Sequence, residues 1–227
     1  MLGGLAALAV SGGAYAYWRH VWFFRHPLRV PPAAEGLVSP ADGTVVYVKK
    51  VEPGADVVVI KQGLAATVRD LVREDSVRTK LVIGIFMSPF DVHYNRVPLD
   101  ASVAFVRRYP SQGGNHHMGA MHWRTLLGIE PRYAGSTHIV QNERTVTSFE
   151  GSFKGAPLRY YVVQIGALTV NGIDSYVKPG QAIARGEVYG MIRIGSQVDL
   201  VVPWDDRFEV GVSPGDRVRA GETILVR

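Results

Sequence analysis

The chain contains no cysteine among its 227 residues, so disulfide bonds, thiolate zinc sites and a cysteine nucleophile are excluded. It also lacks any block of basic residues and any nucleic-acid-binding motif, and no nucleic-acid partner is predicted. The formal net charge of +5 suits an anionic membrane, an acidic substrate or an ordinary solvated surface. The 25 glycines and 13 prolines, in a chain that is 47% hydrophobic, favour a globular domain of short strands and turns.

Charged side chains are missing from residues 2–18, a run at the short end of what a membrane-spanning helix needs. The segment that follows, RHVWFFRHPLR at residues 19–29, mixes aromatic rings, which favour the headgroup level, with arginines, which bind anionic lipid. We therefore expect residues 1–31 to be a membrane anchor with an interfacial segment. The arginines after the run predict a cell-membrane location with the main domain, residues 32–227, on the cytoplasmic face. A signal peptide and a core helix are the alternatives.

The rest of the chain has the pattern of a β protein. Short β-branched and aromatic segments bounded by Pro, Gly and Asp predict strands at 43–48, 80–86, 158–165 and 198–202. One amphipathic helix is predicted over 64–78, and residues 108–137 are expected to form a long functional loop. The predicted fold class is mainly β, a barrel-sandwich-like domain with few helices, plus the N-terminal apolar anchor helix.

An internal repeat supports the barrel-sandwich interpretation. Residues 178–187 (KPGQAIARGE) resemble residues 213–222 (SPGDRVRAGE). Lipoyl and biotinyl carriers are built from such paired hairpins and hold a modified lysine between them. Because residues 188–212 contain no lysine, a carrier function is excluded. The repeat is therefore interpreted as two similar turns in a β scaffold.

Two short segments place titratable residues where a site needs them. SPADG at residues 39–43 is a turn before a strand and presents Asp42. FMSPFDVHYNRVP, residues 86–98, puts Asp91, His93 and Arg96 at the end of a strand, which gives them rigid support. Each has an ordinary structural interpretation as well, a turn aspartate or a hydrogen-bonded histidine.

A third segment, GMIRIGSQVDLVVP at residues 190–203, contains Gly195-Ser196 within an apolar alternation. Glycine has no Cβ, so its carbonyl carbon is open to attack by the hydroxyl of the serine that follows it. Taken alone, a Gly-Ser dipeptide carries almost no information.

In this order the three segments resemble phosphatidylserine decarboxylases of the short bacterial and archaeal class. Asn142-Glu143-Arg144 and the FFRHPLR stretch add to the resemblance, which runs over nearly the whole chain but is weaker at 52–80 and 108–137. It implies a proenzyme that cuts itself between Gly195 and Ser196. The products would be a β chain, residues 1–195, and an α chain, residues 196–227, held together as a heterodimer or a larger oligomer.

The resemblance also implies the cofactor and the reaction. Ser196 would attack the Gly195 carbonyl, and elimination and hydrolysis would leave a pyruvoyl group at the head of the α chain. Its ketone would form a Schiff base with the amine of phosphatidylserine and accept the electron pair as CO2 leaves, which gives phosphatidylethanolamine. The expected partners are therefore phosphatidylserine and an anionic membrane surface.

Residue roles follow from the same resemblance. Asp42 and His93 are expected to assist self-cleavage, the carboxylate fixing the imidazole beside it. Arg96 stands where longer members carry a second histidine, so either His93 serves both steps or another histidine contributes. Arg96 would bind the lipid phosphate or the substrate carboxylate, and Asn142 is also assigned to substrate binding. The other candidate bases are His116, His117, His122 and His138.

Competing interpretations remain at this stage. Gly135-Ser136-Thr137 matches the Gly-Ser-Thr sequence of longer members, but it precedes Asn142, whereas the family's cleavage site follows that motif. A non-enzymatic membrane-anchored β module is the main alternative function, and intact mass distinguishes it. A metal hydrolase using the loop histidines is a second alternative, but their spacing matches no zinc signature, and no metal site is predicted.

Overall fold

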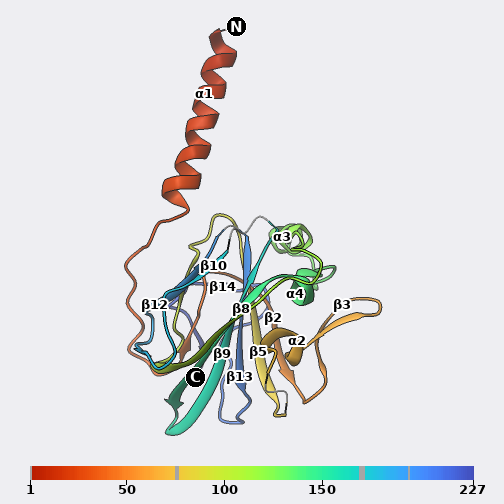
Figure 1. Cartoon of the computed structure of the whole chain (residues 1–227), viewed down its shortest axis with the longest axis vertical. Coiled ribbons are helices and arrows are strands. Elements are labelled where there is room, and N and C mark those ends of the chain that lie inside the picture. The colour runs from red at the N-terminus through yellow and green to blue at the C-terminus, as the bar shows by residue number, and fades with distance from the viewer. Residues whose placement is uncertain (1, 75–76, 169–171, 194) are drawn as a thin grey trace.

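The computed structural model describes all residues except 1, 75–76, 169–171 and 194. For residues 2–8 it describes the backbone but not the side chains. An eight-stranded antiparallel sheet forms the body of the protein (Figure 1). Its strands, in spatial order, are β11 (Ala182–Ile183), β7 (Ala101–Tyr109), β8 (Arg144–Phe153), β9 (Ala156–Gly166), β13 (Ser196–Pro203), β5 (Lys80–Met87), β2 (Gly43–Val51) and β14 (Arg217–Val218).

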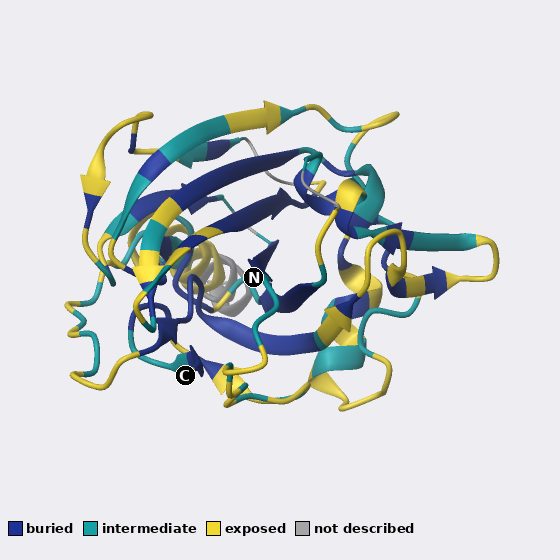
Figure 2. Cartoon of the chain, turned by 90° about the horizontal axis from the view of Figure 1, so that it is seen from below, coloured by how far each residue is buried: buried dark blue, intermediate teal, exposed yellow. Residues whose placement is uncertain are grey.

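Three smaller sheets complete the β structure. One pairs β1 (Leu37–Val38) with β15 (Ile224–Val226), another orders β10 (Ile173–Ser175), β12 (Val188–Ile192) and β6 (Tyr94–Arg96), and the third is a hairpin of β3 (Asp56–Lys61) and β4 (Leu64–Thr67). Figure 2 shows the central strands of the main sheet buried along most of their length, whereas exposure increases along β7 and at the connections. The central strands β5 and β13 therefore give the residues at their ends a rigid support.

Helices are few and, apart from the first, short. They are α1 (Leu2–Tyr17), a π-helical turn η1 (Trp18–Trp22), α2 (Val68–Val72), α3 (Gly119–Leu126) and α4 (His138–Gln141). In Figure 1, α1 stands away from the β domain. No helix within the described residues is both long enough and apolar enough to cross a lipid bilayer. The prediction of a mainly β protein with few helices is confirmed, whereas the membrane anchor stays a prediction.

The helix predicted over 64–78 is confirmed only at residues 68–72, and residues 75–76 lie outside the described part of the chain. Residues 64–67 form β4, which turns back on β3 through Gly63 at φ 73°, a left-handed conformation that glycine adopts readily. Helix α2 begins only after Thr67, whose side chain accepts the Asp70 N–H while the Asp70 carboxylate accepts the Thr67 N–H. The apolar spacing therefore belonged to a strand and a short helix in succession. The four strands predicted from β-branched segments all lie within β2, β5, β9 and β13.

The repeat noted at 178–187 and 213–222 extends to a second pair of segments that the sequence analysis missed. Residues 39–45 (SPADGTV) match residues 97–103 (VPLDASV). We call residues 39–45 with 213–222 the first unit, and residues 97–103 with 178–187 the second unit. Each unit supplies one end strand of the main sheet, β14 on β2 and β11 on β7.

The backbone bonds of the two units agree position by position. Val45 exchanges bonds with Asp216 and Gly215 at 2.9 and 2.8 Å, as Val103 does with Gln181 and Gly180 at 2.9 and 2.7 Å. A β-bulge follows at the same place in both, after Val45 and after Val103. The two units therefore share one local architecture.

Candidate functional site

Ser196 is the first residue of β13, where it pairs with Met87 on β5 and Gly166 on β9. Its side chain is fully buried, and its Oγ has no hydrogen-bond partner among the described residues. Buried hydroxyls are nearly always hydrogen-bonded, so an unpartnered hydroxyl at a strand end is available for another contact or for reaction. Ser196 therefore has the position and the freedom of a nucleophile.

Gly195 has a backbone conformation suited to that reaction. Its φ is 70°, in the left-handed region, and a Cβ there would lie 3.3 Å from the Cβ of Ala167. The Ala167 N–H donates to the Gly195 carbonyl oxygen at 3.2 Å. A hydrogen-bond donor already aimed at this oxygen would stabilise the negative charge that develops when the carbonyl carbon is attacked.

His93 is buried in the loop after β5, and its Nδ1 lies 2.9 Å from the carbonyl oxygen of Asp91. A carbonyl can only accept, so Nδ1 carries the proton and Nε2 presents its lone pair. Within the described residues Nε2 has no partner. The Ile192 N–H donates to the His93 carbonyl at 3.2 Å, which ties this loop to the segment that leads into Gly195-Ser196.

Burial lowers the pKa of His93 to about 4. The bond to the Asp91 carbonyl and the charges of Asp91 and Asp42 act in the opposite direction, and the charge of Arg25 lowers the pKa further. The imidazole is therefore neutral near pH 7, which is the form that a general base needs.

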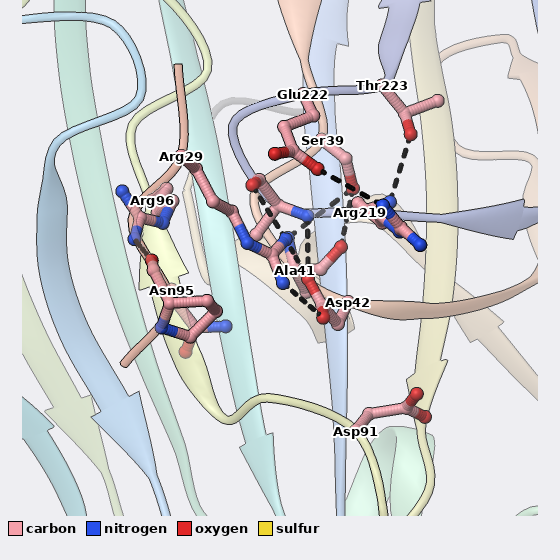
Figure 3. Close-up of polar contacts among 12 residues, drawn as sticks. Arg29, Ser39, Ala41, Asp42, Asp91, Asn95, Arg96, Arg219, Glu222 and Thr223 are labelled. Atoms are coloured by element: carbon pink, nitrogen blue, oxygen red, sulfur yellow. Dashed lines mark hydrogen bonds and ion pairs between the residues drawn. The ribbon is translucent and has the colours of Figure 1, made fainter. Parts of the chain in front are cut away.

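Asp42 follows β1 and is nine-tenths buried. The Arg29 guanidinium donates two hydrogen bonds to its carboxylate, Nη1 to Oδ1 at 2.5 Å and Nη2 to Oδ2 at 2.7 Å (Figure 3). The Ala220 N–H also donates to Oδ1, at 2.8 Å. The sequence analysis expected the Asp42 carboxylate to fix the imidazole. In the structure the Asp91 carbonyl sets the tautomer of His93, and Asp42 pairs with Arg29. A role for Asp42 in cleavage stays a prediction.

Arg96 and Asn142, the predicted substrate-binding residues, are both engaged by the protein itself. The Arg96 guanidinium donates to the carbonyls of Gly186 and Pro27 at 2.7 and 3.1 Å and lies 3.1 Å from Nε2 of His26. The Asn142 amide donates to the carbonyls of Gly166 and His116, and its oxygen accepts the His116 N–H. Asn142 thus fixes the strand opposite Ser196. Ligand binding by either residue would require exchange of these contacts and stays a prediction.

The N-terminal segment after η1 lies directly against the site, which the sequence analysis did not anticipate. Phe23 is fully buried with its ring centroid 4.4 Å from that of His93, and Arg25 donates to the Phe90 carbonyl at 2.5 Å. The ring of His26 lies 4.8 Å from that of Tyr94. The signal was present in the FFRHPLR stretch, where closely spaced aromatic and basic residues were assigned to lipid alone.

A buried polar network begins at Gln197, the residue after Ser196. Its side-chain amide donates to the Tyr47 hydroxyl and to Asp199, both at 2.7 Å, and its oxygen lies 3.0 Å from Nε2 of His138. Burial raises the pKa of Asp199 to about 6 and lowers the pKa of His138 to about 4. Gln197 therefore anchors the strand that Ser196 begins.

The remaining candidates have other contacts. His116 bonds Thr137 through Nδ1 at 3.0 Å, and the His122 ring packs 6.0 Å from Phe86. Ser136, just before α4, is also buried with an Oγ that has no partner among the described residues, and Gly135 before it has φ 75°. The order of the sequence motifs, and not the local backbone geometry, therefore distinguishes Gly195-Ser196 from Gly135-Ser136. Across the part of the chain that the structure describes, no three His, Asp or Glu side chains converge as metal ligands would.

Comparison with known proteins gives this geometry a family. A family model described as phosphatidylserine decarboxylase matches residues 17–226, and the chain belongs to that family. A protein of Saccharopolyspora erythraea, named phosphatidylserine decarboxylase proenzyme, is 34% identical over 217 residues, which are 95% of this chain and 75% of the relative. One of Geotalea daltonii with the same name is 34% identical and covers 90% of this chain and 77% of the relative.

A relative from Methanopyrus kandleri, provisionally named archaetidylserine decarboxylase proenzyme, is 33% identical over 91% of this chain and 80% of its own length. The chain is thus a member of a family of lyases whose relatives are named as proenzymes. The prediction of this family from the three sequence segments is confirmed.

Proposed function

We propose that this protein is a self-processing phosphatidylserine decarboxylase that converts phosphatidylserine to phosphatidylethanolamine and CO2. The observation that carries the proposal is the pair Gly195-Ser196, a left-handed glycine with a hydrogen-bonded carbonyl followed by a buried serine hydroxyl free of partners among the described residues. A pyruvoyl group made from Ser196 is the cofactor that fits this place. When present, its ketone condenses with the substrate amine and accepts the electron pair released with CO2.

Formation of that group balances with the chain's own atoms and one water. Ser196 Oγ adds to the Gly195 carbonyl carbon and the Gly195–Ser196 C–N bond breaks, which leaves an ester and a free amine on residue 196. Loss of the Ser196 α-proton expels the Gly195 carboxylate from Cβ and leaves dehydroalanine. Tautomerisation and addition of water then release ammonia and leave the pyruvoyl group at the head of residues 196–227. The Ala167 N–H would stabilise the oxyanion of the first step.

We assign His93 as the base for these reaction steps. The Asp91 carbonyl accepts the Nδ1 proton and so leaves the lone pair on Nε2, and burial favours the neutral form of the ring. The loop that holds it is bonded to Ile192, four residues before Ser196. After cleavage the same imidazole could return a proton to the decarboxylated carbon, because that step needs an acid in the same space.

We also propose that the protein acts at a membrane surface, through residues 1–31 and a neighbouring apolar rim. Trp22 and Phe90 are 43% and 67% exposed, and the Phe90 ring lies 6.2 Å from that of Trp18. A cavity of about 330 Å³ is lined by Phe90, by Leu126 on α3 and by Arg217, among other residues. Aromatic side chains beside arginines are typical of surfaces that meet lipid headgroups.

Denaturing mass spectrometry of the purified full chain tests the function. We expect two species that divide at 195/196, with the smaller one reactive toward hydroxylamine, and release of CO2 from phosphatidylserine vesicles. Ser196→Ala should remain one uncut chain without decarboxylase activity, whereas Ser136→Ala should be cut normally. An uncut wild-type chain with full activity would refute the proposal. Removal of residues 1–18 should weaken vesicle binding while cleavage continues.

A further inference from the structure

The first and second units of the repeat contain equivalent aspartates, Asp42 and Asp100. Each accepts a backbone N–H from its own Pro-Gly segment through Oδ1, from Ala220 at 2.8 Å and from Arg185 at 2.7 Å. The carboxylate at this position therefore has a structural task that is the same in both units. Any contact that Asp42 makes beyond this shared hydrogen bond is specific to the candidate site.

The difference between the two aspartates is Arg29. Asp42 is buried and receives two hydrogen bonds from the Arg29 guanidinium, whereas Asp100 is exposed and forms no ion pair with any described residue. Arg29 also donates to the Ala220 carbonyl at 2.9 Å. Since the second unit keeps its turn without such an arginine, Arg29 is not needed merely to close the turn.

We propose that residues 23–29 are a positioning element of the maturation site, with Arg29 holding the Asp42 carboxylate and Phe23 holding the His93 imidazole. The proposal rests on the proposed function, since it assigns these residues to the self-cleavage reaction. It differs from a lipid-binding role, because Phe23 and Arg29 point into the protein. Arg29 has 7% of its side chain exposed, and Phe23 has none.

Arg29 fixes the position of the Asp42 carboxylate. A bidentate arginine–carboxylate pair restricts the carboxylate to one plane and one distance. The pair lies close enough to His93 for Asp42 to act on its charge, and Asp91 and Arg25 are the other charged groups that face this imidazole. Loss of Arg29 would leave Asp42 buried with a single backbone donor from Ala220 among the contacts described, so its carboxylate would no longer be held in one orientation.

Phe23 keeps the imidazole dry and in one orientation. Its ring lies against the His93 ring at 4.4 Å, with an interplanar angle of 37°. The Asp91 carbonyl fixes Nδ1, so rotation about the ring is limited from one edge by a hydrogen bond and across one face by Phe23. Without Phe23, water would reach the ring and favour its protonated form, which cannot act as a base.

A consequence is that cleavage depends on the seating of the N-terminal segment. The same segment connects α1 to the domain, so the chain would mature only when residues 23–29 are packed against His93 and Asp42. Segments that order a site in this way act by placing the reacting groups, and a displacement of about 1 Å can cost about a hundredfold in rate.

The experiment measures the rate of cleavage of full-length proenzyme variants by denaturing mass spectrometry, with circular dichroism to verify folding. We expect Arg29→Gln to slow cleavage about tenfold or more and Arg29→Lys to restore part of the rate. Arg185→Gln is the matched control, because Arg185 also binds the N-terminal segment, through the carbonyls of Ala34 and Gly36, but on the second unit. It should be cut at the wild-type rate.

A second variant keeps the proposal falsifiable if Arg29→Gln does not fold. Phe23→Leu keeps an apolar side chain but exposes the imidazole, and its cleavage rate should decline between pH 7 and pH 5, where the wild-type rate stays constant. Wild-type rates in folded Arg29→Gln, or an unchanged pH profile in Phe23→Leu, would overturn the positioning role. An uncut wild-type chain would instead refute the proposed function, so the two failures are distinguishable.

Discussion

In the first and second units of the repeat, a Pro-Gly segment lies along a strand of the main sheet and an aspartate accepts one of its N–H groups. The first unit contains Asp42, one of the predicted site residues, whereas the second unit contains none of them. At the first, the aspartate is buried with Arg29, and at the second it is exposed. The comparison separates what the repeat needs in order to fold from what the site adds.

The two units also differ in which of two neighbouring strands carries a glycine. A Cβ at Gly43 would lie 2.1 Å from the Phe86 carbonyl, so β2 must carry glycine there. In the second unit the equivalent residue is Ala101, and the glycine is Gly151 on the opposite strand. The first arrangement leaves β5 free to carry a large side chain, Met87, and Met87 is the residue that faces Ser196 across the sheet. The glycine of the first unit therefore lies on the strand next to the one that pairs with Ser196.

The largest expected effect is the unequal response of the two aspartates. Asp42→Ala should slow self-cleavage by about two orders of magnitude, because it leaves Arg29 buried without its carboxylate and removes a negative charge that acts on His93. Asp100→Ala removes the same backbone bond at the surface and should cost about 1 kcal/mol of stability with less than a twofold change in cleavage rate. Time courses of cleavage and thermal unfolding of both variants measure this. Equal rates for the two would show that Asp42 is only a turn residue.

Acid should destabilise the protein through two buried histidines, His93 and His138. The pKa values of His93 and His138 are lowered to about 4, and His138 reaches β2 of the first unit through Gln197 and Tyr47. Both histidines have ordinary pKa values near 6.5 when unfolded, so between pH 6.5 and pH 4 the unfolded chain binds more protons. Stability should be constant above pH 6.5 and fall as the pH drops, with a slope of up to about 1.4 kcal/mol per pH unit for each histidine.

Chemical denaturation between pH 8 and pH 4 measures this slope, and His138→Gln should remove about half of it. The cleavage rate is expected to stay level from pH 8 to about pH 5 and to fall below pH 4, where Nε2 of His93 is protonated. A rate that instead falls through pH 6.5 would indicate that His93 is hydrated in the proenzyme.

The sequence predicted the parts of this site that are continuous in the chain. SPADG, the segment with His93 and the Gly195-Ser196 dipeptide are local patterns, and the family and the positions of four strands followed from local residue types. The pairing of Arg29 with Asp42 and of Phe23 with His93 depends on how distant segments pack, and aromatic and basic residues at 19–29 fit a lipid surface equally well. The helix predicted over 64–78 was confirmed only in part for a related reason, since a strand and a short helix in series can imitate amphipathic spacing.

A smaller effect is expected from making the first unit resemble the second at the bulge. Tyr47 follows the bulge in the first unit, and Phe105 occupies the equivalent position in the second. Tyr47→Phe deletes a hydroxyl that donates to Asp199 at 2.8 Å and accepts from Gln197 at 2.7 Å. It should lower the free energy of unfolding by about 2 kcal/mol, because it leaves buried polar groups with fewer partners.

Tyr160→Phe is the matched control, since it deletes a single bond, 2.9 Å, to the Leu99 carbonyl of the second unit. It should cost about 1 kcal/mol. Urea denaturation of the two variants gives the comparison. A smaller loss for Tyr47→Phe than for Tyr160→Phe would show that the network beside Ser196 adds no stability. Cleavage should slow modestly in Tyr47→Phe, since Gln197 keeps its contacts with Asp199 and His138, and remain unchanged in Tyr160→Phe.

The smallest effect concerns the last turn of each unit, where equivalent N–H groups have different acceptors. In the second unit the Glu187 carboxylate accepts the Ala184 N–H at 3.1 Å, and in the first the Thr223 hydroxyl accepts the Arg219 N–H at 2.9 Å (Figure 3). Thr223→Val keeps the shape of the side chain and removes the acceptor. The N–H is partly solvated, so the loss should be about 0.5 kcal/mol. Glu187→Gln keeps an acceptor and should cost less. Because Asp42 and Arg29 hold the other end of the first turn, neither substitution should change the cleavage rate. Slower cleavage in Thr223→Val, measured beside Glu187→Gln at equal stability, would show that this turn also positions Asp42.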